Sequence, residues 1–82
     1  MLRNPSEAEA LFELGRLYAD RGDFFLAIEK FESAAEIYLE LKNFTSYVNA
    51  TNRLLRLYAE TEQQDKVTAV KEKLQDLSLI HI

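Results

Sequence analysis

Two arginines forty positions apart are the side chains best suited to binding a charged group. Arg16 lies in the heptapeptide LGRLYAD of residues 14–20, and Arg56 lies in LLRLYAE of residues 54–60. A guanidinium group binds a carboxylate through two parallel hydrogen bonds, so two such groups on one surface would suit an acidic ligand. Each arginine also has an acid four residues further on, Asp20 or Glu60, and simple helical ion pairs are the alternative.

Other reactive groups are scarce or isolated. The chain has no Cys, and its single histidine, His81, has no second histidine with which to share a metal. No two carboxylates stand in a catalytic context, and no glycine-rich phosphate loop or nucleophile elbow is present. We therefore expect neither an enzyme nor a bound cofactor or metal.

The composition predicts one small globular domain, residues 1–82. Hydrophobic residues make up 48% and charged residues 29%, and the single Pro and two Gly favour long helices with few turns. The net charge of -4 argues against a nucleic-acid partner, because affinity for phosphates comes from clustered Lys and Arg. Without a long apolar run or a basic leader we expect no membrane contact, and we expect a cytoplasmic protein.

Apolar residues at helical spacing predict four helices. The first begins at a capping box of Ser6 and Glu9, and it ends at residues 21–23, where a glycine suits the left-handed backbone past a helix end. Its periodic apolar positions are Ala10, Leu11, Leu14, Leu17 and Tyr18. The chain therefore starts with an amphipathic helix.

Polar turns separate the remaining three helices. Asp23 can cap the second helix, which runs for about five turns from Phe24. Asn43 or Thr45 can cap the third, and the fourth begins near Asp65 after a turn without glycine. The second helix carries an acidic stripe, interpreted here as a solvated outer face, of Glu29, Glu32, Glu36 and Glu40.

Residues 8–38 closely resemble the tetratricopeptide repeat. The positions that carry the resemblance are Leu14, Gly15, Tyr18, Gly22, Ala27, Phe31 and Ala34. The resemblance implies an all-α fold of two antiparallel helix pairs, four helices in all, stacked as a short right-handed solenoid. Repeat one covers about 6–42 and repeat two about 44–78, with a period of forty instead of the family's usual length of about 34.

Residue size gives the two repeats different expected packing. Gly15 and Ala27 are small where paired helices approach closely, while Leu14, Tyr18 and Phe31 are large enough to fill the space between them. Repeat two has Leu55 at the position of Gly15, and Lys71 departs from the pattern as well. We therefore expect a wider or shifted helix pair there, serving as a terminal cap.

Members of this family generally bind a peptide or a partner helix in a groove lined by the first helix of each pair. Carried onto this chain, the groove positions are Glu9, Phe12, Arg16, Ala19, Asn49, Asn52, Arg56 and Ala59, with Arg53 beside them. The arginines suit an acidic ligand and the asparagines suit peptide amides. Phe12 is either an exposed aromatic contact for the partner or part of the core.

The carboxyl end is unusually apolar. Its apolar residues from position 77 onward are Leu77, Leu79, Ile80 and Ile82. They can fold back on the fourth helix or pack against a second copy of the chain. Two repeats with an apolar end indicate either self-association or an excerpt of a longer repeat array. We expect a homodimer, formed by packing of these ends or by exchange of helices between protomers.

These observations predict a non-enzymatic protein-interaction module that self-associates. One alternative is an assembly protein whose main contact is with itself. A second alternative is a sensor that binds a small ligand between its helices.

Overall fold

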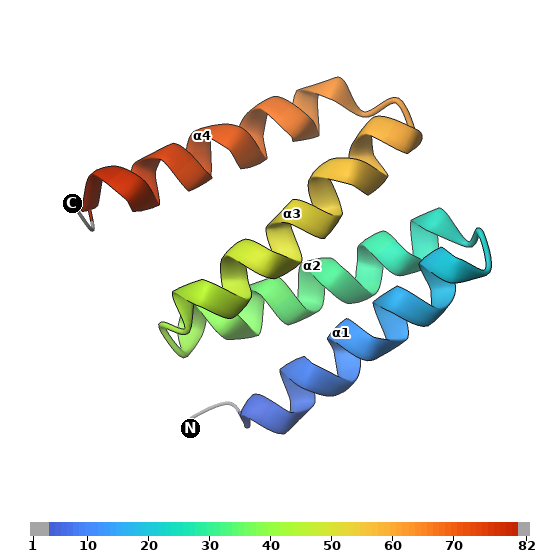
Figure 1. Ribbon diagram of the computed structural model, residues 1–82, viewed down its shortest axis with the longest axis horizontal. Helices are drawn as coiled ribbons and strands as arrows, with labels where there is room; N and C mark the ends of the chain where they lie inside the picture. Colours follow the sequence, from blue (N-terminus) through green and yellow to red (C-terminus); the bar gives the residue numbers. More distant parts are fainter. Residues whose placement is uncertain (1–3, 81–82) are drawn as a thin grey trace.

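The computed structural model describes residues 4–80, with the side chains of residues 77–80 outside the description. Within this range the chain is all-helical, which confirms the predicted all-α fold of four helices. The helices are α1 (Pro5–Asp20), α2 (Phe24–Glu40), α3 (Phe44–Glu60) and α4 (Gln64–Ile80). Three-residue turns reverse the chain between them, so successive helices are antiparallel (Figure 1). None of the helices described here combines the length and the apolar character needed to cross a bilayer.

The three turns share one backbone geometry. The middle residue of each turn has a positive φ, with values of 83° at Gly22, 59° at Lys42 and 61° at Glu62. The amide of the residue that follows bonds back to the carbonyl oxygen of a tyrosine five positions earlier, at 2.9, 2.9 and 2.7 Å. The accepting tyrosines are Tyr18, Tyr38 and Tyr58. This is the Schellman arrangement, which satisfies carbonyl groups left open at a helix end.

The start of α1 differs from the prediction. The capping residue is Asn4, whose side-chain oxygen accepts a 2.9 Å hydrogen bond from the backbone amide of Ser6. Pro5 occupies the first helical position, where its fixed φ fits the helix and its missing N–H costs nothing. The predicted capping box of Ser6 and Glu9 is therefore wrong.

The residue at the amino end of α3 makes a capping hydrogen bond, whereas the one at the amino end of α2 does not. Asn43 caps α3 as predicted, accepting a 3.3 Å hydrogen bond from the amide of Ser46. Asp23 stands at the capping position of α2, but its side chain makes no capping hydrogen bond. The α1–α2 turn is thus held by its backbone bonds.

The core lies along α2, which packs against α1 on one side and α3 on the other. Phe31 is 1% exposed and lies over Gly15, where an added Cβ would come within 2.9 Å of the phenyl ring. Gly15 is therefore small for the predicted reason. Figure 1 shows α4 diverging from the other helices beyond the last turn, and it packs mainly on α3.

One expectation about a single side chain was wrong. Leu14 is 40% exposed and does not fill the space between paired helices, because the face of α1 that carries it has no helix against it. Glu32 is exposed, as predicted for the acidic stripe, and its carboxylate also accepts a hydrogen bond from the hydroxyl of Tyr58 on α3. This bond ties repeat one to repeat two.

Candidate functional site

A hollow lies between α1 and α3, with α2 contributing to its lining. Its volume is about 350 Å³. It is lined by Ala19, Asp20, Phe24, Phe31, Arg53, Arg56, Leu57 and Glu60. We call it the arginine hollow, since Arg53 and Arg56 line it together with two acids and four apolar residues. Its position between the first helices of the two pairs matches the groove that the repeat resemblance implies.

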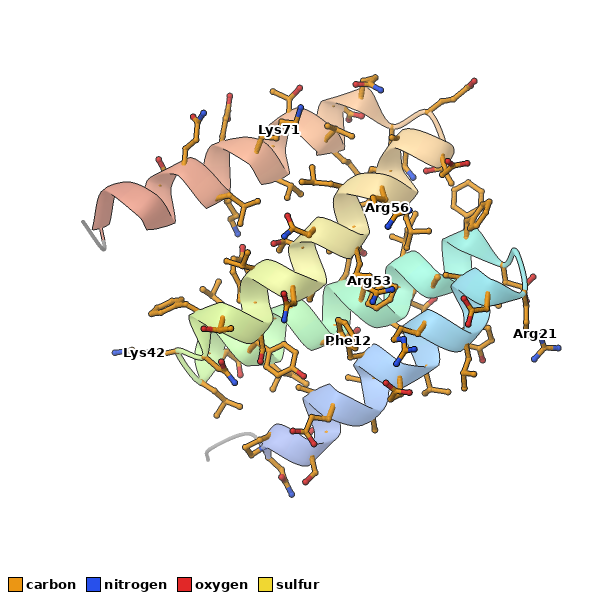
Figure 2. The ribbon with its side chains drawn as sticks, viewed as in Figure 1. Phe12, Arg21, Lys42, Arg53, Arg56 and Lys71 are labelled. Atoms are coloured by element: carbon orange, nitrogen blue, oxygen red, sulfur yellow. The ribbon has the colours of Figure 1, made fainter. Side chains whose placement is uncertain are left out.

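An aromatic cluster positions Arg53 at this groove. The Phe12 ring meets the Phe31 ring edge-on, with centroids 5.2 Å apart and planes at 70°. The guanidinium carbon of Arg53 lies 5.6 Å from the centroid of the Phe12 ring, and Figure 2 shows the two side chains together between α1 and α3. Such a cation–π contact is worth about 0.5–1 kcal/mol at a solvated site. Phe12 is half-buried, so it both packs on the core and borders the groove.

Neither arginine of the hollow is neutralised by a neighbouring acid. Asp20 and Glu60 line the same hollow, yet among the described residues no carboxylate forms an ion pair with Arg53 or Arg56. The helical pair between Arg56 and Glu60, the alternative reading of that arginine, is not formed. Both guanidinium groups therefore keep their donors available for a ligand.

Arg16 behaves differently from its counterpart Arg56. Its Nη1 atom donates to the Glu13 carboxylate at 2.8 Å, and it does not line the arginine hollow. The predicted alternative partner, Asp20, is wrong, because the acid three residues earlier holds the guanidinium instead. The two repeated arginines are thus not brought together, and Arg53 takes the place beside Arg56.

A second, smaller hollow lies at the other end of the groove. Its volume is about 90 Å³, and it is lined by Phe12, Tyr38, Ser46 and Asn49. Burial raises the pKa of Tyr38, and the negative charge of Glu9 raises it further. The charge of Glu9 therefore acts on Tyr38, which lines the same small hollow as Asn49. A hollow of this size holds about three water molecules.

The remaining groove positions are exposed and outside both hollows. Asn52 and Ala59 lie on the solvent side of α3 and line neither one. Of the apolar carboxyl-terminal residues, the side chains of Leu77, Leu79 and Ile80 and all of Ile82 lie outside the described residues, as does His81. Their predicted role in self-association stays a prediction.

Sequence reasoning missed much of the lining of the arginine hollow. Phe31 was predicted only as a packing residue, and Phe24 and Leu57 were given no site role, yet all three line the hollow. The forty-residue recurrence of Tyr18 at Tyr58 was the available signal, because it marks equivalent ends of α1 and α3. Within the described residues, no three acidic or histidine side chains gather to hold a metal ion.

No protein-family model, curated protein or solved structure matches the chain. The function that the groove can support must therefore be argued from its own geometry.

Proposed function

We propose that this protein is an interaction module, similar to a pair of tetratricopeptide repeats, that holds an acidic peptide in the groove between α1 and α3. The observation that carries the proposal is the pairing of Arg53 and Arg56 in one hollow without a described acidic partner. Surface arginines with a carboxylate in reach normally pair with it when the geometry allows. Arg53 and Arg56 do not, so both guanidinium groups are available for the carboxylate of a bound ligand.

The lining of the hollow also suits the apolar part of a peptide. Phe24, Phe31 and Leu57 offer apolar surface next to the guanidinium groups. A peptide with alternating acidic and apolar side chains would place its acidic side chains against the arginines and its apolar side chains against these three residues. Asp20 and Glu60 at the same hollow can accept hydrogen bonds from peptide amides, and they oppose the entry of highly charged polyanions.

Binding of a defined probe tests the proposal. We would titrate the protein into a fluorescein-labelled octapeptide of alternating glutamate and leucine and follow fluorescence anisotropy. The variant Arg56→Glu should weaken binding by about 10-fold to 100-fold, because hydrogen bonds to charged groups contribute roughly 1.5–3 kcal/mol each. Raising the salt concentration should weaken it as well, since the contact is partly solvated.

Arg16→Glu is the matched control, because it makes the same charge change at the equivalent position of repeat one. Arg16 is already paired with Glu13 and lies outside the hollow, so its reversal should leave probe affinity within about threefold, the effect of a distant surface charge. Equal losses in the two variants would mean a non-specific charge effect. No saturable binding of the probe by the wild type would reject the acidic-peptide proposal.

A small carboxylate ligand is the second candidate, and the volume of the hollow favours it. At about 350 Å³ the arginine hollow falls within the range of small-molecule sites, roughly 300–1,000 Å³. A dicarboxylate such as glutarate could bridge Arg53 and Arg56. Competition in the same anisotropy assay separates the candidates. If the protein binds peptides, glutarate should release no more probe than sodium chloride does at the same ionic strength. If it binds small carboxylates, glutarate should release more.

A further inference from the structure

The outer face of α1 is apolar and exposed. Leu14 is 40% exposed and Leu17 is 57% exposed. Their counterparts forty positions later on α3, Leu54 and Leu57, are only 3% and 6% exposed. The same residue types at the same helix positions are therefore buried in one repeat and open in the other.

The internal repeat shows why the α3 copy of this face is buried. Helix α3 packs against α2, and the Tyr58 hydroxyl donates to Glu32 across that contact. Helix α1 packs against α2 through the face that carries Gly15, which leaves its Leu14 face without a neighbour in the described chain. The Leu14 face thus has the chemistry of a helix-packing surface.

The exposed face forms a regular stripe along the whole of α1. It consists of Glu7, Ala10, Leu14, Leu17 and Arg21, all of them exposed and spaced three, four, three and four residues apart. This is the heptad spacing of a two-helix seam. The stripe begins with an acid and ends with a base, and Figure 2 shows the Arg21 side chain directed away from the helices.

A second copy can meet this stripe with either of two helices. Helix α4 is the repeat equivalent of α2, but the buried residues Ile28, Phe31 and Ala35 of α2 are replaced forty positions later by exposed polar ones. Those replacements are Thr68, Lys71 and Gln75. At these three positions α4 therefore presents polar side chains where α2 presents apolar ones, whereas α1 of a second copy presents the same leucines.

We propose that two copies of the chain pair through α1 in antiparallel orientation, with Leu14 of one copy against Leu14 of the other. In this register the acidic Glu7 lies opposite the basic Arg21 at both ends of the seam, and Ala10 lies one residue from the level of Leu17. The pairing is isologous, so it closes as a two-fold dimer without leaving a free copy of the face. Charge complementarity selects the antiparallel orientation, because a parallel pair would place like charges together.

The surface buried by one such helix pair is smaller than the roughly 1,200–2,000 Å² of a standard stable interface. The dimer is therefore expected to be weak, so it must be measured at high protein concentration. The inference does not depend on the groove, because the stripe and the arginine hollow share no residue.

Disulfide trapping tests the register, and the chain has no Cys of its own to interfere. The variant Leu14→Cys should form a covalent dimer under mild oxidation, since Leu14 meets its own symmetry mate. Leu17→Cys alone should remain largely monomeric, but an equimolar mixture with Ala10→Cys should form the mixed dimer. Phe25→Cys is the control, because Phe25 is 71% exposed and lies outside the stripe. Equal trapping of Leu14→Cys and Leu17→Cys would overturn the antiparallel register.

Charge reversal tests the same register without a cross-link. Sedimentation velocity up to about 1 mM protein, a range that detects millimolar association, should show monomer and dimer only. Glu7→Arg and Arg21→Glu should each weaken the dimer, by roughly 3-fold to 30-fold for two exposed ion pairs, and the double variant should restore it. Circular dichroism confirms that each variant keeps its helices.

Two results would overturn the proposal. Monomer alone across the whole concentration range would reject pairing through α1. Open-ended growth that Leu14→Cys does not trap would instead indicate head-to-tail stacking of α4 on α1.

Discussion

The two helix pairs of this protein share a repeated sequence but pack differently. In repeat one the ring of Phe31 lies directly over Gly15, and any Cβ there would approach the ring to 2.9 Å. In repeat two the equivalent positions hold Leu55, which is half-buried, and Lys71, which is exposed. Figure 1 shows α4 turning away from α3 beyond the last turn, and α1 packs on α2 more closely than α4 packs on α3. The close approach depends on the pairing of a small residue with a large one.

The equivalent leucines on the outer faces of α1 and α3 also differ in exposure. Leu54 and Leu57 are buried because α2 covers them, whereas Leu14 and Leu17 are exposed because nothing in the described chain does. The residue types are equal, so the difference comes from position in the stack. Burial in a repeat protein is a property of the neighbours as much as of the residue.

The largest expected effect is at the contact that distinguishes the two repeats. Phe31 is 1% exposed, and its ring contacts both Phe12 and Gly15. Phe31→Ala should lower the free energy of unfolding by about 3–5 kcal/mol, since it removes a buried aromatic ring and leaves a cavity. A native domain has only about 5–15 kcal/mol in total, so this loss is a substantial part of its stability. Urea denaturation followed by circular dichroism measures the change.

Lys71→Ala is the control for this prediction, because Lys71 stands at the equivalent position of α4. An exposed side chain there should change the unfolding free energy by no more than about 0.5 kcal/mol. Comparable losses in the two variants would mean that the repeats pack alike after all.

The next effect concerns the hydrogen bond between the repeats. Tyr58 is 4% exposed and its hydroxyl donates to the Glu32 carboxylate. Tyr58→Phe should lower the unfolding free energy by about 1–2 kcal/mol, the range between neutral and charge-assisted hydrogen bonds. Tyr18→Phe is the matched change in repeat one, where the hydroxyl has no hydrogen-bond partner among the described residues, and it should cost less than about 0.5 kcal/mol.

The same bond gives the stability a pH dependence. Burial raises the pKa of Tyr58 well above its usual range, and the hydrogen bond to Glu32 and the negative charge of that carboxylate raise it further. The folded state therefore favours the neutral hydroxyl, and this contribution is complete below the unfolded pKa of about 10. It is lost as the pH rises above that value. Between pH 9 and about 11 the wild type should lose more stability than Tyr58→Phe, and parallel losses would contradict the assignment.

Much of the fold was predictable because its signals are local. Helical spacing of apolar residues and the turn at Gly22 depend only on neighbours in sequence, and the small residue at Gly15 matched the large one at Phe31. The cap at Asn4 was missed because Ser6 offered a plausible alternative two residues later. A short polar side chain is chosen as a cap by backbone geometry, which the sequence does not display.

Arg53 and Arg56 were both among the predicted groove residues, but the expected pairing of Arg16 with Arg56 was wrong. Repetition favoured Arg16 and Arg56 together, yet Arg16 is held by Glu13 and Arg53 takes its place through the ring of Phe12. Which of several acids a long side chain pairs with depends on rotamers and on small energy differences. The contact of Arg53 with Phe12 joins α3 to α1, so no pattern within one helix could have indicated it.

The smallest predicted effect compares the turns. Gly22 and Glu62 both have left-handed backbones, with φ of 83° and 61°, but only glycine adopts this conformation without steric cost. Glu62→Gly should raise the unfolding free energy by about 0.5–1 kcal/mol, the steric cost of roughly 1–2 kcal/mol less the entropy that glycine adds to the unfolded chain. Gly22→Ala should lower it by about 1 kcal/mol for the converse reason, since no atom lies within 4 Å of an added Cβ and backbone strain acts alone. Both changes are measured by urea denaturation at low protein concentration, where self-association does not contribute. A loss of stability in Glu62→Gly would show that the last turn relies on the glutamate side chain, and the two turns would then differ in kind.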